Sequence, residues 1–346
     1  MFRPRSVGAL VALLVAFVAL PLFAEDNDRF EVKFGKNLQF RGGRVNIDHG
    51  FGDLTLRTHA GNDVQVRATI RSSDEEVGKQ IRIIASEGPG GVTVRTEFPT
   101  IRSYRGSLSY SVDMSVLLPA NAPLSAKNQF GGIKARGLAM ASTLENKQGS
   151  ISLHDSRGSH SLSNAFGSIE IVDNRGNLNV SNSNGSIDVR KVEGVLTVAN
   201  RFGSVDVADV KNATTIANAN GSVEVLDIGG PLKATNAFGS IKASSISGSA
   251  DVTTSNARVD LSNVKGSAVV RNSFGSVVVN TIQGDLTVDG SNSKVDAEGV
   301  SGNVRIDTSF GGVALKDIGG AVTITNSNGN IRVSDIGGPL TAETQF

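Results

Sequence analysis

Residues 167–184 read Gly-Ser-Ile-Glu-Ile-Val-Asp-Asn-Arg and then Gly-Asn-Leu-Asn-Val-Ser-Asn-Ser-Asn, two nine-residue halves that each begin with glycine. In both halves positions 3 and 5 are apolar, and positions 2 and 4 are polar. Alternation with a period of two is typical of a short strand with one buried face. The stretch therefore predicts two strands that are joined by two turns.

The same unit recurs without insertion to the end of the chain. Residues 131–346 number 216, which is 12 units of 18, and position 5 is Val, Ile, Leu or Ala in all 24 halves. A strict repeat is typical of a solenoid, in which each unit contacts its neighbours. We therefore predict an all-β fold, a single-stranded parallel β-solenoid with two short strands in each 18-residue coil.

The two halves differ at their turns. The first half has an aliphatic residue at position 8, which we expect to fill one corner of the coil. The second half usually has Asn at position 7, and its position 9 alternates between Phe and Asn. An Asn side chain can bond to the backbone of a turn and of the next coil, while Gly permits the bend. We interpret this second corner as structural.

The predicted structural set consists of Phe166, Phe202, Phe238, Phe274 and Phe310, the asparagines Asn164, Asn182, Asn200, Asn218 and Asn236, and the glycines Gly167, Gly185, Gly203, Gly221 and Gly239. The Phe/Asn alternation also gives a formal 36-residue period. A four-sided 36-residue coil would enclose a lumen wider than the roughly 10 Å that two facing apolar layers fill. We therefore favour the 18-residue coil, in which Asn leaves room for Phe on adjacent coils.

The N-terminus has the layout of a secretory signal peptide. Arg3 and Arg5 precede an apolar run that ends at Ala24, before acidic Glu25. We expect residues 1–24 to be removed on export, with an uncleaved membrane anchor as the alternative. The chain has no Cys, so it has neither disulfides nor thiolate metal sites. We expect an exported protein, periplasmic or at the cell surface, without a transmembrane segment after cleavage.

The mature chain is close to neutral. Without Arg3 and Arg5 it has 32 basic and 33 acidic residues, a formal charge of −1. Such a balance does not favour nucleic acid as a partner. We predict no nucleic-acid partner and no cofactor.

Residues 25–127 are predicted to form an N-terminal β region ahead of the solenoid at 128–346. The repeat is in phase at residues 43–60 and then gives way, from 62 to 120, to longer expected strands at 64–70, 81–85, 92–98 and 108–118, with one helical turn at 75–80. We expect this excursion to cap the open N-terminal edge of the stack. At the other end a repeat unit finishes at Phe346. Either the chain continues in a longer protein, or its last coil self-associates edge to edge.

A family resemblance is carried by the exported N-terminus, the early strand pair, the segment Leu117–Pro123 and the repeated Asn-x-Phe/Asn-Gly-Ser-Ile/Val units. With these features, nearly the whole mature chain resembles the bacterial putative-adhesin family, Gly-rich β-strand repeat proteins of unknown function. The resemblance implies a β-solenoid. It brings no catalytic or binding residues to carry over.

The sequence lacks the marks of an enzymatic solenoid. Polysaccharide-cleaving β-helices build a cleft from long loops around clustered acids, whereas residues 131–346 have no insertions. Calcium-binding β-rolls need acidic Gly-Gly-x-Gly-x-Asp turns, and here Gly is followed by Ser and an aliphatic residue. We therefore predict that the protein is not an enzyme.

Two polar features stand out in the repeat. His160 is predicted to point inward beside Ser142 of the previous coil and to bond to it. Glu170, Asp188, Asp206 and Glu224 form an outward acidic ladder with a spacing of about 4.8 Å. The ladder is interpreted as a solvated face, with a cation site as the alternative.

The leading functional hypothesis is an exported, non-enzymatic β-solenoid that acts in adhesion or scaffolding at the bacterial cell envelope. Its partner would be a protein or a surface polysaccharide. One alternative is a carbohydrate-active β-helix enzyme or glycan-binding module. Converging carboxylates in residues 62–130 would favour this alternative. Another is a regulatory envelope protein that binds a signalling partner.

Overall fold

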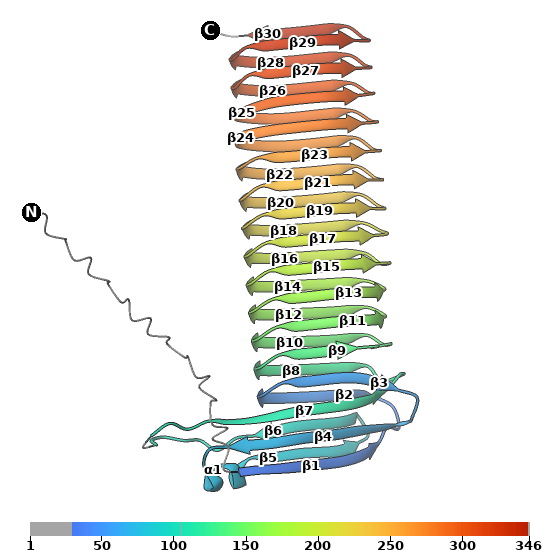
Figure 1. Cartoon of the computed structure of the whole chain (residues 1–346). Helices are drawn as coiled ribbons and strands as arrows, with labels where there is room; N and C mark the ends of the chain where they lie inside the picture. The colour runs from blue at the N-terminus through green and yellow to red at the C-terminus, as the bar shows by residue number, and fades with distance from the viewer. Residues whose placement is uncertain (1–29, 105, 345–346) are drawn as a thin grey trace, which may run out of the picture.

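The computed structural model describes residues 30–104 and 106–344, so the predicted signal peptide lies outside the described residues. The chain forms a tall stack of coils on a broader N-terminal base (Figure 1). Apart from one short helix, the described residues that have regular structure are in strands. The predicted parallel β-solenoid is confirmed.

Each coil contributes one strand to each of two parallel sheets. β13 (Ile169–Arg175) of the first sheet pairs with β15 (Ile187–Val192) so that Ile169 lies beside Ile187. In the second sheet β14 (Leu178–Asn184) pairs with β16 (Leu196–Phe202) at the same offset. This register confirms the 18-residue coil and excludes the 36-residue alternative.

The remaining strands of the first sheet are β9 (Ile133–Arg136), β11 (Ile151–Arg157), β17 (Val205–Val210), β19 (Val223–Ile228), β21 (Ile241–Ile246), β23 (Val259–Val264), β27 (Val313–Ile318) and β29 (Ile331–Ile336). Those of the second sheet are β8 (Leu124–Phe130), β10 (Ser142–Gln148), β12 (His160–Phe166), β18 (Thr214–Asn220), β20 (Leu232–Phe238), β22 (Ala250–Asn256), β26 (Val304–Phe310), β28 (Val322–Asn328) and β30 (Leu340–Thr344). β24 (Ala268–Ile282) and β25 (Leu286–Val300) continue through a corner and belong to both sheets.

The core lies between the two sheets. Side chains at positions 3 and 5 point inward, as Ile169 and Ile171 do with no exposed surface. The aliphatic residue at position 8 of the first half is also buried, from Val192 to Ile318. These residues fill one corner, as predicted, so apolar contacts continue from coil to coil.

The corner after the second half is built from Asn and Gly. Asn164 donates through Nδ2 to the carbonyl oxygens of Gly149 at 2.9 Å and Gly167 at 3.0 Å, which joins two coils. Gly185 has φ 139°, and a Cβ there would lie 2.2 Å from the carbonyl oxygen of Gly167. Glycine is therefore required both by the backbone conformation and by the close approach of the coils.

The N-terminal base caps the stack. Its elements are β1 (Phe30–Gln39), β2 (Arg44–Phe51), β3 (Leu54–His59), β4 (Asp63–Ser72), α1 (Glu75–Gln80), β5 (Arg82–Gly88), β6 (Gly91–Glu97) and β7 (Tyr110–Pro119). β2 and β3 form a coil that pairs in parallel with β8 and β9 on one side and with β6 and β7 on the other. Beyond them β4, β5 and β1 add antiparallel strands. The parallel ladder thus ends in antiparallel pairing, which confirms the predicted cap.

At the opposite end, among the described residues, β29 pairs with β27 and β30 pairs with β28, each on one side. Leu340 of this coil is 51% exposed. Edge-to-edge self-association at this coil stays a prediction. No helix in the described part of the chain has the length and apolar character that crossing a membrane requires.

Candidate functional site

The corner after the first half has an unusual backbone. Its position 7 has a positive φ, between 51° and 72°, at Asp155, Asp173, Lys191, Asp209, Asp227, Ser245, Asn263, Thr281, Gly299, Asp317 and Asp335. The left-handed conformation is disfavoured for most side chains but is tolerated by Asp and Asn, which explains why Asp dominates the column. It bends the chain sharply, so the residue at position 8 is buried while positions 7 and 9 remain at the surface.

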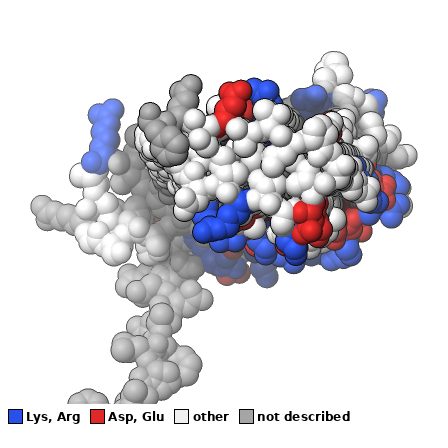
Figure 2. All heavy atoms as spheres, turned by 90° about the horizontal axis from the view of Figure 1, so that it is seen from above, with Lys and Arg blue, Asp and Glu red and all other residues white. Residues whose placement is uncertain are grey.

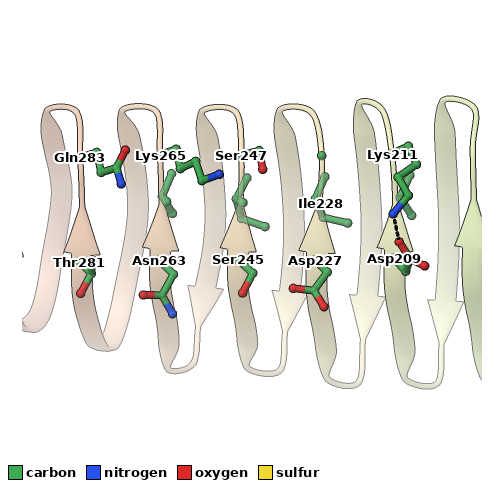
Figure 3. Close-up of a pocket in the computed structure, with 14 residues that line it drawn as sticks. Asp209, Lys211, Asp227, Ile228, Ser245, Ser247, Asn263, Lys265, Thr281 and Gln283 are labelled. Atoms are coloured by element: carbon green, nitrogen blue, oxygen red, sulfur yellow. Dashed lines mark hydrogen bonds and ion pairs between the residues drawn. The ribbon is translucent and has the colours of Figure 1, made fainter.

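A groove runs along this corner over five coils. It has a volume of about 420 Å³. Figure 3 shows one row of side chains from position 7, namely Asp209, Asp227, Ser245, Asn263 and Thr281, and a second row from position 9, namely Lys211, Ser247, Lys265 and Gln283. Buried residues of position 8, such as Ile228 and Ile246, form its floor. We call it the corner groove.

The chemistry of the corner groove changes along its length. At one end Lys211 Nζ donates to Asp209 Oδ1 at 2.5 Å, and this bond raises the pKa of Lys211. At the other end Asn263, Thr281 and Gln283 offer amide and hydroxyl groups. The groove is open and follows the rod axis, with donors and acceptors repeated at about the 4.8 Å spacing of stacked strands. It suits an extended ligand better than a compact one.

The corner groove was missed by sequence reasoning. Its signal was the run of Asp and Asn at position 7 of the first half, because after glycine these residues adopt a positive φ most readily. The sequence argument followed position 8 and overlooked the residue before it. The two rows become one site only when successive coils stack in register.

The predicted acidic ladder is assembled by the sheet register. Glu170, Asp188, Asp206 and Glu224 are successive partners across β13, β15, β17 and β19. Arg190 donates to both oxygens of Asp188 at 2.9 Å, and Lys242 lies 2.6 Å from Glu224. Two of the four carboxylates, Asp188 and Glu224, are thus paired directly with cations.

Among the described residues, no group of three or more His, Asp or Glu side chains is arranged to hold a metal ion. A row along a flat sheet does not supply the convergent oxygen ligands that a divalent cation needs. The interpretation of the ladder as a solvated face stays a prediction.

His160 lies inside the solenoid, as its register predicts. It is 3% exposed and is the parallel partner of Ser142. The predicted bond between them is wrong, because Ser142 Oγ donates to the carbonyl of Met140 at 2.9 Å and neither ring nitrogen of His160 has a partner. Burial lowers the pKa of His160 to about 4. The nearby backbone of Arg157 acts in the other direction and raises the pKa, but its effect is smaller.

The phenylalanines of the second corner lie at the surface. The rings on every second coil are 38% to 57% exposed, and we call Phe130, Phe166, Phe202, Phe238, Phe274 and Phe310 the phenylalanine row. Asn184 lies between Phe166 and Phe202 in the sheet register. The rings therefore do not fill the core, and the structural role predicted for them stays a prediction.

Two carboxylates in the cap region lie near each other. Asp113 Oδ1 accepts from the backbone N–H of Asp53 at 3.2 Å. Asp113 is paired with Arg71 at 2.6 Å and Asp53 with Lys134 at 3.3 Å, and both acids are about half exposed. A bond from the Gly132 N–H lowers the pKa of Asp53. Both acids are therefore held by cations at the surface.

Charges of both signs are interspersed around the rod. Viewed along the axis, Lys and Arg lie beside Asp and Glu on the visible sides (Figure 2). A mixed surface of this kind agrees with the near-neutral composition.

No family model matches the chain, and no curated relative matches it. Three solved structures are similar to it. A putative cell adhesion protein from Clostridium sporogenes is 12% identical, with 83% of this chain and 99% of that chain covered and a TM-score of 0.25. A putative adhesin from Parabacteroides distasonis is 12% identical, with 85% and 97% covered and a TM-score of 0.21.

The third structure is a putative adhesin from Bacteroides fragilis, 10% identical, with 90% of this chain and 97% of that chain covered and a TM-score of 0.18. All three are described as a putative adhesin or a putative cell adhesion protein. Likeness of this degree does not identify a function.

Proposed function

We propose that the protein is exported and works in the bacterial cell envelope as a non-enzymatic, adhesin-like binding or scaffolding β-solenoid. The proposal includes removal of residues 1–24 and a division into the N-terminal β region 25–127 and the solenoid 128–346. Its partner is a protein or a surface polysaccharide of the envelope. The observation that carries it is the corner groove.

The corner groove supports binding of an extended partner for three reasons. Its floor is buried core, so the two side-chain rows are held on a rigid base. Its polar groups recur at the coil spacing, so a chain-like ligand can make the same contact several times. It is open along its length, whereas catalysis usually needs a concave site that excludes water.

The amide and hydroxyl groups at the end of the groove away from Asp209 favour a glycan over a strongly charged polymer. Asn263, Thr281 and Gln283 provide amide and hydroxyl groups, which match sugar hydroxyls as both donors and acceptors. Lys211 is already paired with Asp209. A glycan-binding module is therefore the second candidate within the same proposal.

Export is tested by fractionating cells that express the full chain. We expect the protein in the periplasmic or surface fraction, shortened at its N-terminus as mass spectrometry would show. Recovery of the full-length chain in the cytoplasm alone would contradict the proposal.

Binding is tested by retention on envelope polysaccharide and on solubilised envelope protein. The groove variant combines Asn263→Ser, Lys265→Ser and Gln283→Ser, and Ser245 and Ser247 show that Ser is accepted at positions 7 and 9. We expect this variant to lose binding. The control changes the acidic ladder, with Asp206→Asn and Glu224→Gln. Equal binding by all three proteins would exclude the corner groove.

A further inference from the structure

The phenylalanine row has a regular spacing along the rod. Its rings lie on every second coil, so neighbouring rings are separated by two strand spacings, or roughly 10 Å. The coils between them have Gln148, Asn184, Asn220, Asn256 and Asn292 at the same position, and Asn328 follows Phe310. The row therefore alternates large apolar and small polar side chains.

The asparagines between the rings leave slots open. Asn184 Nδ2 is 3.4 Å from the carbonyl oxygen of Ala165, and Asn220 Nδ2 is 3.4 Å from that of Arg201. Each amide thus lies back on the preceding coil. The space beside it, between two phenyl rings, is lined by short side chains, since the neighbouring positions are mostly Ser, Ala and Gly.

The pair Phe51 and Phe130, at the N-terminal end of the row, shows how a ring can pack against its neighbour at this corner. Phe51 and Phe130 occupy this corner on adjacent coils, and their rings stack with centroids 4.6 Å apart and planes 3° from parallel. Rings at this corner can therefore face each other along the rod axis at the coil spacing. A slot of roughly 10 Å between two rings holds one more ring with the same stacking distance on both sides.

We propose that a second copy of this chain docks along the phenylalanine row, with the rings of each copy in the slots of the other. A second copy has the same spacing, so five of its rings enter slots beside Asn at once, while its Phe310 lies against Gln148. A two-fold axis perpendicular to the row gives a closed, antiparallel pair of rods with the same surface used on both copies. This self-association goes beyond the proposed binding role and does not depend on the corner groove.

The exposed area of the rings is sufficient for a dimer. A phenylalanine buries roughly 200 Å² when fully enclosed, so six half-exposed rings offer on the order of 600 Å² per copy. The flanking small residues add to this area. The total for two copies reaches about 1,200 Å², the lower end of specific interfaces.

A membrane surface is the competing occupant. The charged residues next to the row, Lys147, Arg201, Arg258 and Lys294, are all basic. Arg258 and Lys294 are paired with Asp260 and Asp296, which leaves Lys147 and Arg201 to suit anionic lipid. A membrane would, however, make no use of the empty slots. It would bind a continuous row of rings at least as well as an alternating one.

The test is analytical ultracentrifugation of the purified, exported protein at up to about 100 μM, with small-angle scattering of the same samples. We expect a dimer whose cross-section is enlarged and whose length is close to that of one rod. A monomer at this concentration, or a dimer of doubled length, would overturn the proposal.

Two variants sharpen the test. Phe202→Ser, Phe238→Ser and Phe274→Ser together remove three exposed rings, and we expect dimerisation to weaken at least about 100-fold. Asn184→Phe, Asn220→Phe and Asn292→Phe together fill three slots, and the stacked Phe51 and Phe130 show that the fold accepts adjacent rings. The slot-filled variant is more apolar, yet we expect it to be monomeric. Stronger association of this variant would refute docking into slots.

Vesicles decide the membrane alternative. Phosphatidylserine-rich vesicles should not retain the wild-type protein, and added salt should leave the dimer intact or strengthen it, because the charges flanking both rows are basic. Vesicle binding that depends on the phenylalanine row and weakens with salt, without a dimer, would overturn the proposal in favour of a lipid surface. Thermal unfolding of each variant shows whether it is folded.

Discussion

Thr281 is a β-branched residue at φ 61°, in the column of left-handed residues. Both Thr281 and Asn263 are exposed, so substitutions there act mainly through the backbone. We expect Thr281→Asn to stabilise the protein by about 1 kcal/mol, because Asn tolerates this conformation better. Chemical denaturation measures the change. The matched reverse substitution, Asn263→Thr, should destabilise by a similar amount, and equal stability of both variants would contradict the argument.

The single residue His160 makes the free energy of unfolding depend on pH. Its pKa is lowered to about 4 in the folded state from the ordinary histidine value of 6.5. Above pH 6.5 the ring is neutral in both the folded and the unfolded chain, so it adds no pH-dependent cost. As the pH falls toward 4, the unfolded chain binds a proton at this ring and the folded chain does not. Roughly 3 kcal/mol of stability is lost over this range.

His160→Leu should remove that part of the loss, since Leu178 fills the same inward position on the next coil. The measurement is the free energy of unfolding at about pH 7 and about pH 4.5. Burial also lowers the pKa of His49, so some acid sensitivity should persist in the variant. An unchanged pH profile would show that His160 is accessible to protons in the folded protein.

The element that sets the coil is the Asn-Gly corner. Gly203 has φ 128°, and a Cβ there would lie 2.3 Å from the carbonyl oxygen of Gly185. We expect Gly203→Ala to cost about 3 kcal/mol or more, from backbone strain and from contact with the previous coil. Gly90→Ala is the control, because nothing lies within 4 Å of a Cβ there.

Two corners of the stack manage without this glycine. Ala257 and Ser293 occupy its place, and neither has a positive φ. At the second of these corners Gly290 replaces the usual Asn, and Ser293 Oγ donates to the Asn272 carbonyl at 2.8 Å instead. A mild effect of Gly203→Ala would mean that this alternative corner is available throughout the stack.

On the scale of the whole molecule, stability is a sum over neighbouring coils. Deleting residues 185–202 removes one coil and joins Asn184 to Gly203 in phase. We expect this variant to keep its β-sheet circular dichroism and to unfold cooperatively. Deleting residues 176–184 removes half a coil and sets the left-handed corner where the Asn-Gly corner belongs, so we expect this variant not to fold. Similar melting of the two variants would contradict the difference between the corners.

The coil can be derived from the sequence alone. Alternation at positions 3 and 5 predicted the strands, the 18-residue period predicted their stacking, and the longer strands of residues 62–120 predicted the cap. All three follow from local pattern and from the need to bury one face of each strand. Even the inward place of His160 could be predicted from its register.

The arrangement of side chains on the surface, in contrast, depends on how the coils stack in three dimensions. The corner groove needs side chains from several successive coils. The left-handed backbone at position 7 shapes it, and residues such as Lys191 and Thr281 do not reveal this conformation in the sequence. The position of the phenylalanines is also not given by the sequence. A Phe that recurs with this period can lie in the core or at the surface, because the sequence repeat is the same in both cases. The rings lie at the surface because the side chains of positions 3 and 5 already fill the space between the two sheets.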